Sequence, residues 1–215
     1  MESYDWAFDA YLSGAVFTAF DIETTGLDPK QDRIVEFGCV KFDKRGLIAR
    51  YSTLINPGIP MPEAAGKVNN ITDEMLIRQP PLEVVFPDFL RFIKGTVIVA
   101  HNAQFDCGFV NENLSLLYAA AKKTGASKED DLFSTGSDGP EKADWAPPFP
   151  ALPNQIADTL LIARRIFPNR GKYNLQDLAS GLGIDTANAH RAEDDALVCM
   201  KIFIQCCGAA KPAVR

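Results

Sequence analysis

The chain has 215 residues, of which 47% are hydrophobic, so it is long enough for one domain with a sizeable core. Its 22 basic and 28 acidic residues give a net charge of -6, which argues against broad adhesion to a nucleic-acid backbone or an anionic membrane. Residues 1–13 lack the pattern of a secretory signal, and no apolar run approaches a membrane span. The five cysteines form no metal-ligand spacing, which predicts buried free thiols in a reducing compartment. We therefore expect a cytoplasmic protein without a membrane partner.

The first part of the chain predicts three β-strands. Apolar or alternating stretches bounded by turn residues cover residues 15–23, 33–43 and 47–55. The connection Asp43-Lys44-Arg45-Gly46 is short, so we expect the second and third strands to pair as a hairpin. A loop rich in proline follows them.

The middle of the chain predicts two helices, a buried strand and a longer helix. Thr72 is expected to cap a short helix, and residues 82–94 have the helical spacing of apolar positions, although Pro87 should kink or restart that helix. Residues 96–100 form a continuous apolar run, which is typical of a central strand covered on both faces. A helix over about residues 103–122 follows directly.

An irregular stretch at about residues 124–154 shows no sustained period, and we treat it as an insertion in a single domain of residues 1–215. The favoured interpretation is a surface loop. The alternative is a segment that binds a partner or covers the substrate, with Trp145 and Phe149 as its contact residues. Beyond it we expect one short strand and three helices, at residues 155–158, 159–167, 174–183 and 191–207.

Two carboxylates share one face of the first predicted strand. In Phe-Asp-Ile-Glu-Thr-Thr-Gly, residues 20–26, Asp21 and Glu23 are two positions apart, so their side chains point to the same side at about 6.5–7 Å. Like charges this close in a partly buried setting repel unless a cation or a proton neutralises them. Oxygen ligands without a nearby cysteine favour Mg²⁺ or Mn²⁺ over zinc. Gly26 then ends the strand in a turn that lets a ligand approach the backbone.

A second acidic residue pattern lies where the strand at residues 96–100 gives way to a helix. In His-Asn-Ala-Gln-Phe-Asp, Asp106 falls in the first helical turn, near the positive end of the helix dipole. Asn102 stands at the N-cap position. We interpret His101 as a packing and hydrogen-bonding residue rather than a ligand.

A third pattern, Ala-His-Arg-Ala-Glu-Asp-Asp, begins the last predicted helix. Asp195 shares a stripe with apolar residues at 192, 198, 199 and 202, which turns it toward the core, whereas Asp194 leans toward solvent. His190 lies five positions before Asp195, so we expect it to precede the regular helix and reach back.

Taken together, FDIETTG, HNAQFD and HRAEDD resemble the three motifs of the DEDDh branch of the DnaQ-like 3′-to-5′ exonucleases, within the RNase H-like superfamily. Their order, their flanking residues and the His-to-Asp step agree with the family. The similarity extends over roughly residues 16–204 and includes residues 69–75 and 158–160. The resemblance implies an α/β fold: a mixed five-stranded sheet, with its first three strands antiparallel and its later strands parallel, flanked by helices.

The resemblance also implies the catalytic residues and two divalent metal ions, Mg²⁺ or Mn²⁺. Asp21 would contact both ions, Glu23 and Asp195 would complete the coordination of the first, and Asp106 would support the second. Neutral His190 would take the proton from the attacking water as general base. The products would be a nucleoside 5′-monophosphate and a chain one unit shorter.

Residues implied for substrate contact are Thr24, Thr25, Gly26, Leu27, Asn69, Asn102 and Phe105. By family analogy the two threonines hold the terminal sugar, and Leu27 or Phe105 packs against the end nucleotide. Many relatives have His-Gly where this chain has Asn69-Asn70, so a histidine contact does not carry over. Six basic residues are candidates for distant phosphates or for ordinary solvated charge: Lys67, Arg164, Arg165, Arg170, Lys172 and Arg191.

The implied substrate is a single-stranded or frayed 3′ end of DNA, in proofreading or repair, with a DNA polymerase subunit as protein partner. An alternative with the same chemistry is an exoribonuclease or oligoribonuclease, because the motifs do not distinguish DNA from RNA. An alternative of another class is a module that mainly binds a polymerase. Metal ions reconcile the acidic composition with a polyanionic substrate.

Overall fold

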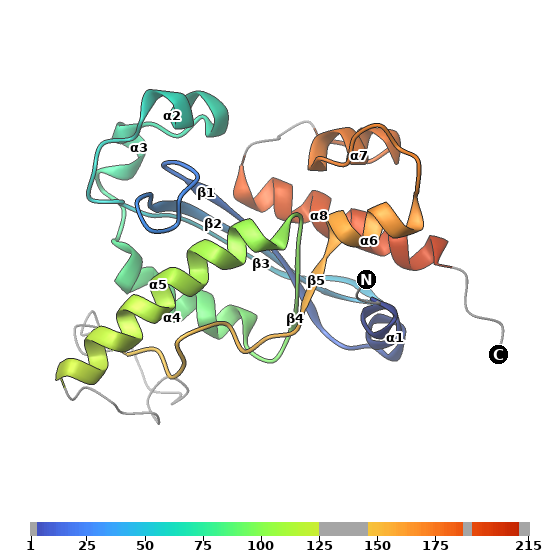
Figure 1. The fold of residues 1–215 in the computed structure, drawn as a ribbon, viewed down its shortest axis with the longest axis horizontal. Helices are drawn as coiled ribbons and strands as arrows, with labels where there is room; N and C mark the ends of the chain where they lie inside the picture. Colours follow the sequence, from blue (N-terminus) through green and yellow to red (C-terminus); the bar gives the residue numbers. More distant parts are fainter. Residues whose placement is uncertain (1–3, 125–145, 187–190, 211–215) are drawn as a thin grey trace.

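The computed structural model describes residues 4–124, 146–186 and 191–210. Five strands form one sheet in the order β3-β2-β1-β4-β5 (Figure 1). They are β1 (Phe17–Thr24), β2 (Ile34–Asp43), β3 (Gly46–Leu54), β4 (Val97–Ala100) and β5 (Ile156–Asp158). The first three strands are antiparallel, and β4 and β5 run parallel to β1. The predicted mixed sheet is therefore confirmed.

Helices cover both faces of this sheet (Figure 1). One core joins α1, α6, α7 and α8 to one face, and a second core joins α4 and α5 to the other. The helices are α1 (Asp5–Ser13), α2 (Glu63–Asn69), α3 (Asp73–Leu76), α4 (Leu82–Ile93), α5 (Ala103–Thr124), α6 (Thr159–Ile166), α7 (Leu175–Gly181) and α8 (Ala192–Ala209).

The alternation of side chains along β1 decides on which face its acids lie. Phe17 and Ala19 belong to the core under α8, whereas Phe20 and Ile22 belong to the core under α4 and α5. Because successive side chains of a strand point to opposite faces, the odd-numbered positions that follow also face α8. The carboxylates at positions 21 and 23 are therefore on the α8 side.

Two helices were not predicted from the sequence. Residues 5–13 form α1, which buries Ala7 and Phe8. The region read as a proline-rich loop contains α2, which begins directly after Pro62 at the N-cap. Proline is compatible with a helix start, because the first N–H groups of a helix have no partner within it.

The expected effect of Pro87 and the expected cap at Thr72 need correction. Pro87 lies inside α4, which runs as one helix, so the predicted restart is wrong. Pro87 is buried, as are Phe86 and the other residues with which α4 packs on the sheet. Thr72 takes the N-cap position of α3, but its hydroxyl donates to the Glu74 carboxylate at 3.0 Å instead of capping the backbone.

Three further predictions concern the cysteines, membrane spans and the irregular stretch at about residues 124–154. The cysteines are free and four of them are buried, as predicted. In the described part of the chain no helix is both long enough and apolar enough to cross a membrane. Residues 146–154 have no regular structure. Trp145 and most of the predicted insertion lie outside the described residues, and Phe149 packs against the protein's own core.

Candidate active site

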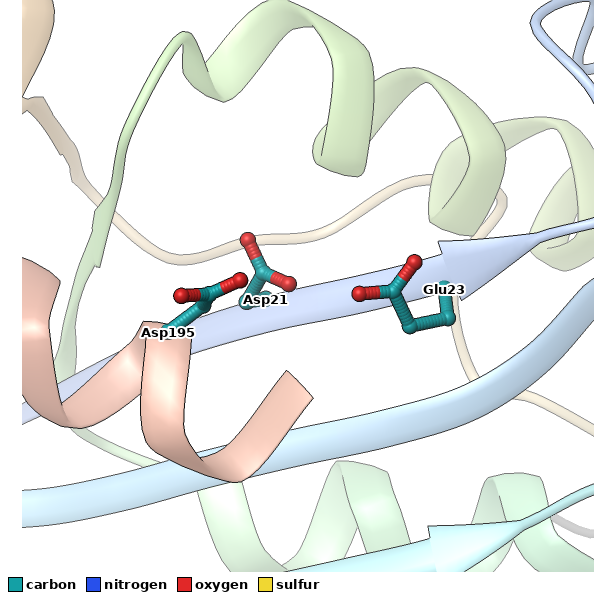
Figure 2. Close-up of side chains that lie close together, drawn as sticks. All are labelled: Asp21, Glu23 and Asp195. Carbon is teal, nitrogen blue, oxygen red and sulfur yellow. The ribbon is translucent and has the colours of Figure 1, made fainter. Parts of the chain in front are cut away.

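Three carboxylates from two ends of the chain meet on the α8 side of the sheet. Asp21 and Glu23 project from β1 and Asp195 from the first turns of α8, into the same space (Figure 2). Each offers one oxygen, and these oxygens lie within 4.8 Å of one another. The predicted convergence of these three residues is confirmed.

The start of α8 lies close to the acids of β1 because a glycine in β2 leaves room for the helix backbone. Gly38 is the β2 partner of Asp21, and a Cβ atom there would overlap the backbone of Ala192 and Glu193. Glycine is therefore required by close approach of two backbones. On the exposed side, Arg50 of β3 pairs with Glu193 at 3.0 Å.

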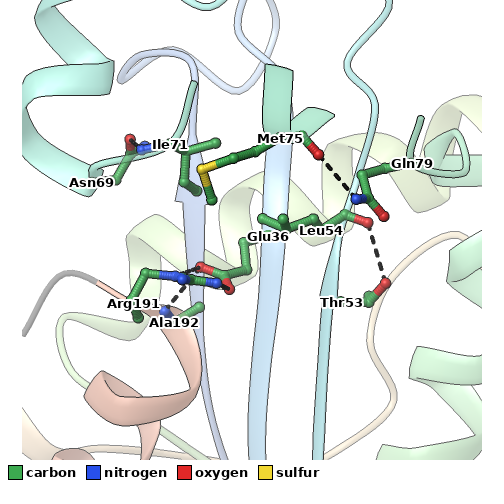
Figure 3. Close-up of polar contacts among 9 residues, drawn as sticks. All are labelled: Glu36, Thr53, Leu54, Asn69, Ile71, Met75, Gln79, Arg191 and Ala192. Atoms are coloured by element: carbon green, nitrogen blue, oxygen red, sulfur yellow. Dashed lines mark hydrogen bonds and ion pairs between the residues drawn. The ribbon is translucent and has the colours of Figure 1, made fainter. Parts of the chain in front are cut away.

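An ion pair between a buried carboxylate and a partly exposed arginine fixes the same helix start (Figure 3). Glu36, 1% exposed, accepts from Arg191 Nη2 at 2.6 Å and from the Ala192 N–H at 3.2 Å. The carboxylate thus satisfies both a guanidinium and one of the unpaired N–H groups at the helix N-terminus. Asp195 follows one turn later, which places it over Asp21.

Asp106 arrives at the same strand from the opposite edge. The pairing of β4 with β1 covers only Phe17–Ala19, so on that edge β1 has no strand beside it farther along, although β2 continues on the other edge. There the Ile22 N–H donates to Asp106 Oδ1 at 3.2 Å. Asp106 is 3% exposed, and its carboxylate lies outside the group of three within 4.8 Å. The Asp106 side chain therefore accepts a backbone hydrogen bond from β1 at a position that β4 does not reach.

Asp158 at the end of β5 anchors the helix that carries Asp106. Its carboxylate accepts from the Ala103 N–H of α5 at 3.0 Å and from the Leu160 N–H of α6 at 2.8 Å. Asn102 occupies the expected N-cap position with a left-handed φ of 63°, but it is Asp158 that supplies the capping acceptor. One carboxylate therefore caps two helices.

His101 is a packing residue, as predicted. Its Nε2 lies 2.7 Å from the Tyr173 carbonyl and its Nδ1 lies 2.9 Å from the Thr159 hydroxyl. Burial lowers the pKa of His101, so the ring is neutral. Since a carbonyl only accepts, the proton of the neutral ring is on Nε2.

The acids of the site have raised pKa values, because burial and neighbouring negative charges disfavour their ionised forms. Burial raises the pKa of Asp21 well above its ordinary value, and the charges of Asp106 and Asp195 raise it further. Burial, followed by the charges of Asp195 and Glu36, raises the pKa of Glu23 to about 7. Burial also raises the pKa of Asp106 to about 8, although two backbone N–H groups oppose this rise. Carboxylates in such a state bind protons or a cation.

The threonines and glycine after Glu23 build a tight turn. The Thr24 hydroxyl donates to the Gly26 carbonyl at 2.6 Å, and the Thr25 hydroxyl accepts from the Arg33 N–H at 2.9 Å. A Cβ atom at Gly26 would overlap the Asp32 carboxylate. Both hydroxyls are therefore engaged in the loop itself.

The other residues implied for substrate contact differ in their exposure. Leu27, directly after the turn, is 82% exposed. Asn102 is exposed, and Phe105 is half-buried against Phe109 with ring centroids 5.1 Å apart. Asn69 is 2% exposed: it donates to the Thr24 carbonyl at 3.4 Å and accepts from the Ile71 N–H at 3.1 Å. His190 lies outside the described residues.

All six basic residues weighed for distant phosphates have partners within the protein. Four form ion pairs, and two lie over aromatic rings. The pairs are Lys67–Glu63, Arg165–Asp5, Lys172–Asp177 and Arg191–Glu36, and the ring contacts are Arg164–Tyr173 and Arg170–Phe167.

Sequence reasoning missed two residues that touch this site. Glu36 holds Arg191 from a distance of 155 positions along the chain, and Gln176 Nε2 donates to Asp195 Oδ1 at 2.7 Å across 19 positions. Neither contact leaves a local pattern, because the partners belong to different elements. Only the charge of Glu36 among the apolar residues of the first part of β2 was a visible signal.

A protein-family model described as "Exonuclease" matches residues 18–138 and 142–203. The chain belongs to the exonuclease family. It is 44% identical over 202 residues to DNA polymerase III subunit epsilon of Treponema pallidum, covering 93% of this chain and 80% of that protein. It is 33% identical to DNA polymerase III PolC-type of Clostridium perfringens, of whose length it covers 11%. The fold is similar to that of exonuclease X in complex with 5′ overhanging duplex DNA, with a TM-score of 0.61, 22% identity and coverage of 90% and 92% of the two chains.

Proposed function

We propose that this exonuclease removes nucleoside 5′-monophosphates one at a time from the 3′ end of DNA, as the proofreading activity that accompanies a DNA polymerase. The observation that carries the proposal is the meeting of Asp21, Glu23 and Asp195 within 4.8 Å. The similarity to a DNA polymerase III subunit over most of both chains supports DNA as the substrate and a polymerase as the partner.

The donor set fits divalent cations. The three carboxylates present hard oxygen atoms. The raised pKa values of Asp21 and Glu23 mean that a nearby positive charge would stabilise their ionised forms. We assign Asp21, Glu23 and Asp195 as ligands of Mg²⁺ or Mn²⁺ and Asp106 as support for a second ion. When bound, such ions neutralise the charge that develops on the phosphoryl group and on the leaving oxygen.

The protein's own residues then position and deprotonate. His190 is the proposed general base: as a neutral imidazole it accepts the proton of the attacking water. The next residue, Arg191, pairs with Glu36 of β2 at 2.6 Å. The chain directly after His190 is therefore fixed to the sheet that carries Asp21. Attack of the water oxygen on phosphorus breaks the bond to the 3′ oxygen and releases the terminal nucleotide with its 5′-phosphate.

Leu27 is the proposed contact for the terminal base. It is 82% exposed directly after the turn that follows Glu23, where its apolar side chain would pack against the face of an unpaired base. Phe105 offers a second apolar surface, and exposed Asn102 lies beside it in the chain. Because the hydroxyls of Thr24 and Thr25 hold the turn together, we assign these residues, with Gly26 and buried Asn69, to shaping the pocket for the terminal nucleotide.

The test uses matched DNA and RNA oligonucleotides labelled at their 5′ ends, incubated with the protein and Mg²⁺ or Mn²⁺. The expected result is a ladder of shortened DNA together with release of nucleoside 5′-monophosphates. A ladder from RNA alone would make the enzyme an exoribonuclease, and no release with either ion would reject the enzymatic proposal. Asp21→Asn, with its folding checked by circular dichroism, serves as the inactive control.

A further inference from the structure

We propose that Gln176 is a positioning residue that holds the Asp195 carboxylate in the orientation needed to bind the metal ion. This inference rests on the proposed metal-dependent hydrolysis. The Gln176 carboxamide donates from Nε2 to Asp195 Oδ1 at 2.7 Å, a charge-assisted hydrogen bond. Hydrogen bonds of this kind to a ligating carboxylate fix its rotamer and tune its affinity for the ion.

Gln176 comes from an element that is itself firmly held. It is the second residue of α7, whose N-cap Asn174 accepts from the Asp177 N–H. Leu178 and Ala179 of the same helix are fully buried against α8. Directly before the helix, the Tyr173 carbonyl binds His101 at the end of β4. The carboxamide is thus carried on a rigid support, fixed to both the sheet and the helix that bears Asp195.

The carbonyl oxygen of the same carboxamide does not stabilise the fold. Its Oε1 is buried and has no hydrogen-bond partner among the described residues. A buried carbonyl without a partner costs about 1–3 kcal/mol, so a residue selected for folding alone would be apolar here. The unpaired acceptor is tolerated because the donor on the same group is needed at Asp195.

Gln176→Met tests the role of this residue, because methionine keeps the length and shape of the side chain. The variant loses the donor to Asp195 and also loses the unpaired carbonyl. We expect Mn²⁺ affinity to fall roughly 10- to 100-fold, while the midpoint of urea unfolding in EDTA changes little, because the lost hydrogen bond to Asp195 and the removed unpaired carbonyl have opposite effects on stability. Mn²⁺ binding is measured directly by electron paramagnetic resonance on the protein without substrate.

The matched control is Gln205→Met on α8. Gln205 is also a carboxamide bonded within the protein, donating to the Leu182 carbonyl at 3.1 Å, but it is exposed and makes no contact with the acids of the site. Its substitution is expected to leave Mn²⁺ affinity unchanged. Gln176→Asn provides a second test should the methionine variant fail to fold, because it retains the amide but withdraws it by one methylene, and the same weakening is expected.

The outcomes separate this inference from the proposed function. Wild-type protein that binds Mn²⁺ and degrades DNA, with a folded position-176 variant of unchanged Mn²⁺ affinity, would overturn only the role of Gln176. A parallel loss of unfolding free energy and affinity would show a merely structural role and would overturn it as well. Wild-type protein that binds no Mn²⁺ would refute both proposals together.

Discussion

Substitution of Glu23 by glutamine tests whether the site is strained without a cation. The pKa of Glu23 rises from an ordinary 4.5 to about 7, mainly through burial. One pKa unit corresponds to about 1.4 kcal/mol, so ionised Glu23 lowers the free energy of unfolding by at most about 3 kcal/mol at pH 8. Because the folded-state pKa is the higher one, this penalty grows as pH rises from about 4.5 to 7 and amounts to about 1 kcal/mol at pH 5.

Glutamine at position 23 cannot ionise, so Glu23→Gln should be more stable than the wild type in EDTA, by about 3 kcal/mol at pH 8 and about 1 kcal/mol at pH 5. Urea unfolding at both pH values measures the difference. Added Mn²⁺ should stabilise the wild type strongly and the variant weakly. Glu83→Gln, at an exposed position of α4, should change stability by no more than ~0.5 kcal/mol. A variant that is less stable than the wild type at pH 8, or a difference independent of pH, would refute the reasoning.

Three further substitutions test the supports of the site. Gly38→Ala places a methyl group against the backbone of α8; we expect a loss of about 1–3 kcal/mol in urea unfolding and a lower kcat from the displaced helix, and unchanged values would contradict the close approach. Asp158→Ala removes the cap of two helices and should cost roughly 1–2 kcal/mol per cap, so a loss below about 0.5 kcal/mol would mean that the caps are not shared. His190→Ala should slow hydrolysis roughly 10²- to 10⁴-fold with Mn²⁺ binding retained, and full activity would remove His190 from the mechanism.

The sheet could be predicted because its signals are local. The alternation of apolar residues in β1 and β2 and the continuous run of β4 are properties of short stretches, and they fix both the strands and the face of each side chain. Helix α2 was missed because Pro62 and its neighbours also suit a loop. Pro87 was expected to kink or restart α4, but the helix continues through it, because its burial against the sheet outweighs the hydrogen bond that proline cannot make.

The acids of the site could be predicted for the same reason, and their supports could not. Asp21 and Glu23 show their shared face within three residues of sequence. Gln176 bonds to Asp195 across 19 positions of the chain. Glu36 bonds to Arg191 across 155 positions. A single sequence carries no mark of such contacts, because they depend on where helices land after packing.

The mismatch in length between β1 and β4 has a consequence for how this enzyme can evolve. The pairing of the two strands stops at Ala19, and only this early end leaves room for α5 to bring Asp106 to the Ile22 N–H. Two more residues of regular pairing would complete the sheet and shut the acids away from Asp106. The candidate site thus lies where the pairing of two strands stops, and we expect a variant with longer pairing between β1 and β4 to gain backbone hydrogen bonds and to lose the contact between Asp106 and Ile22.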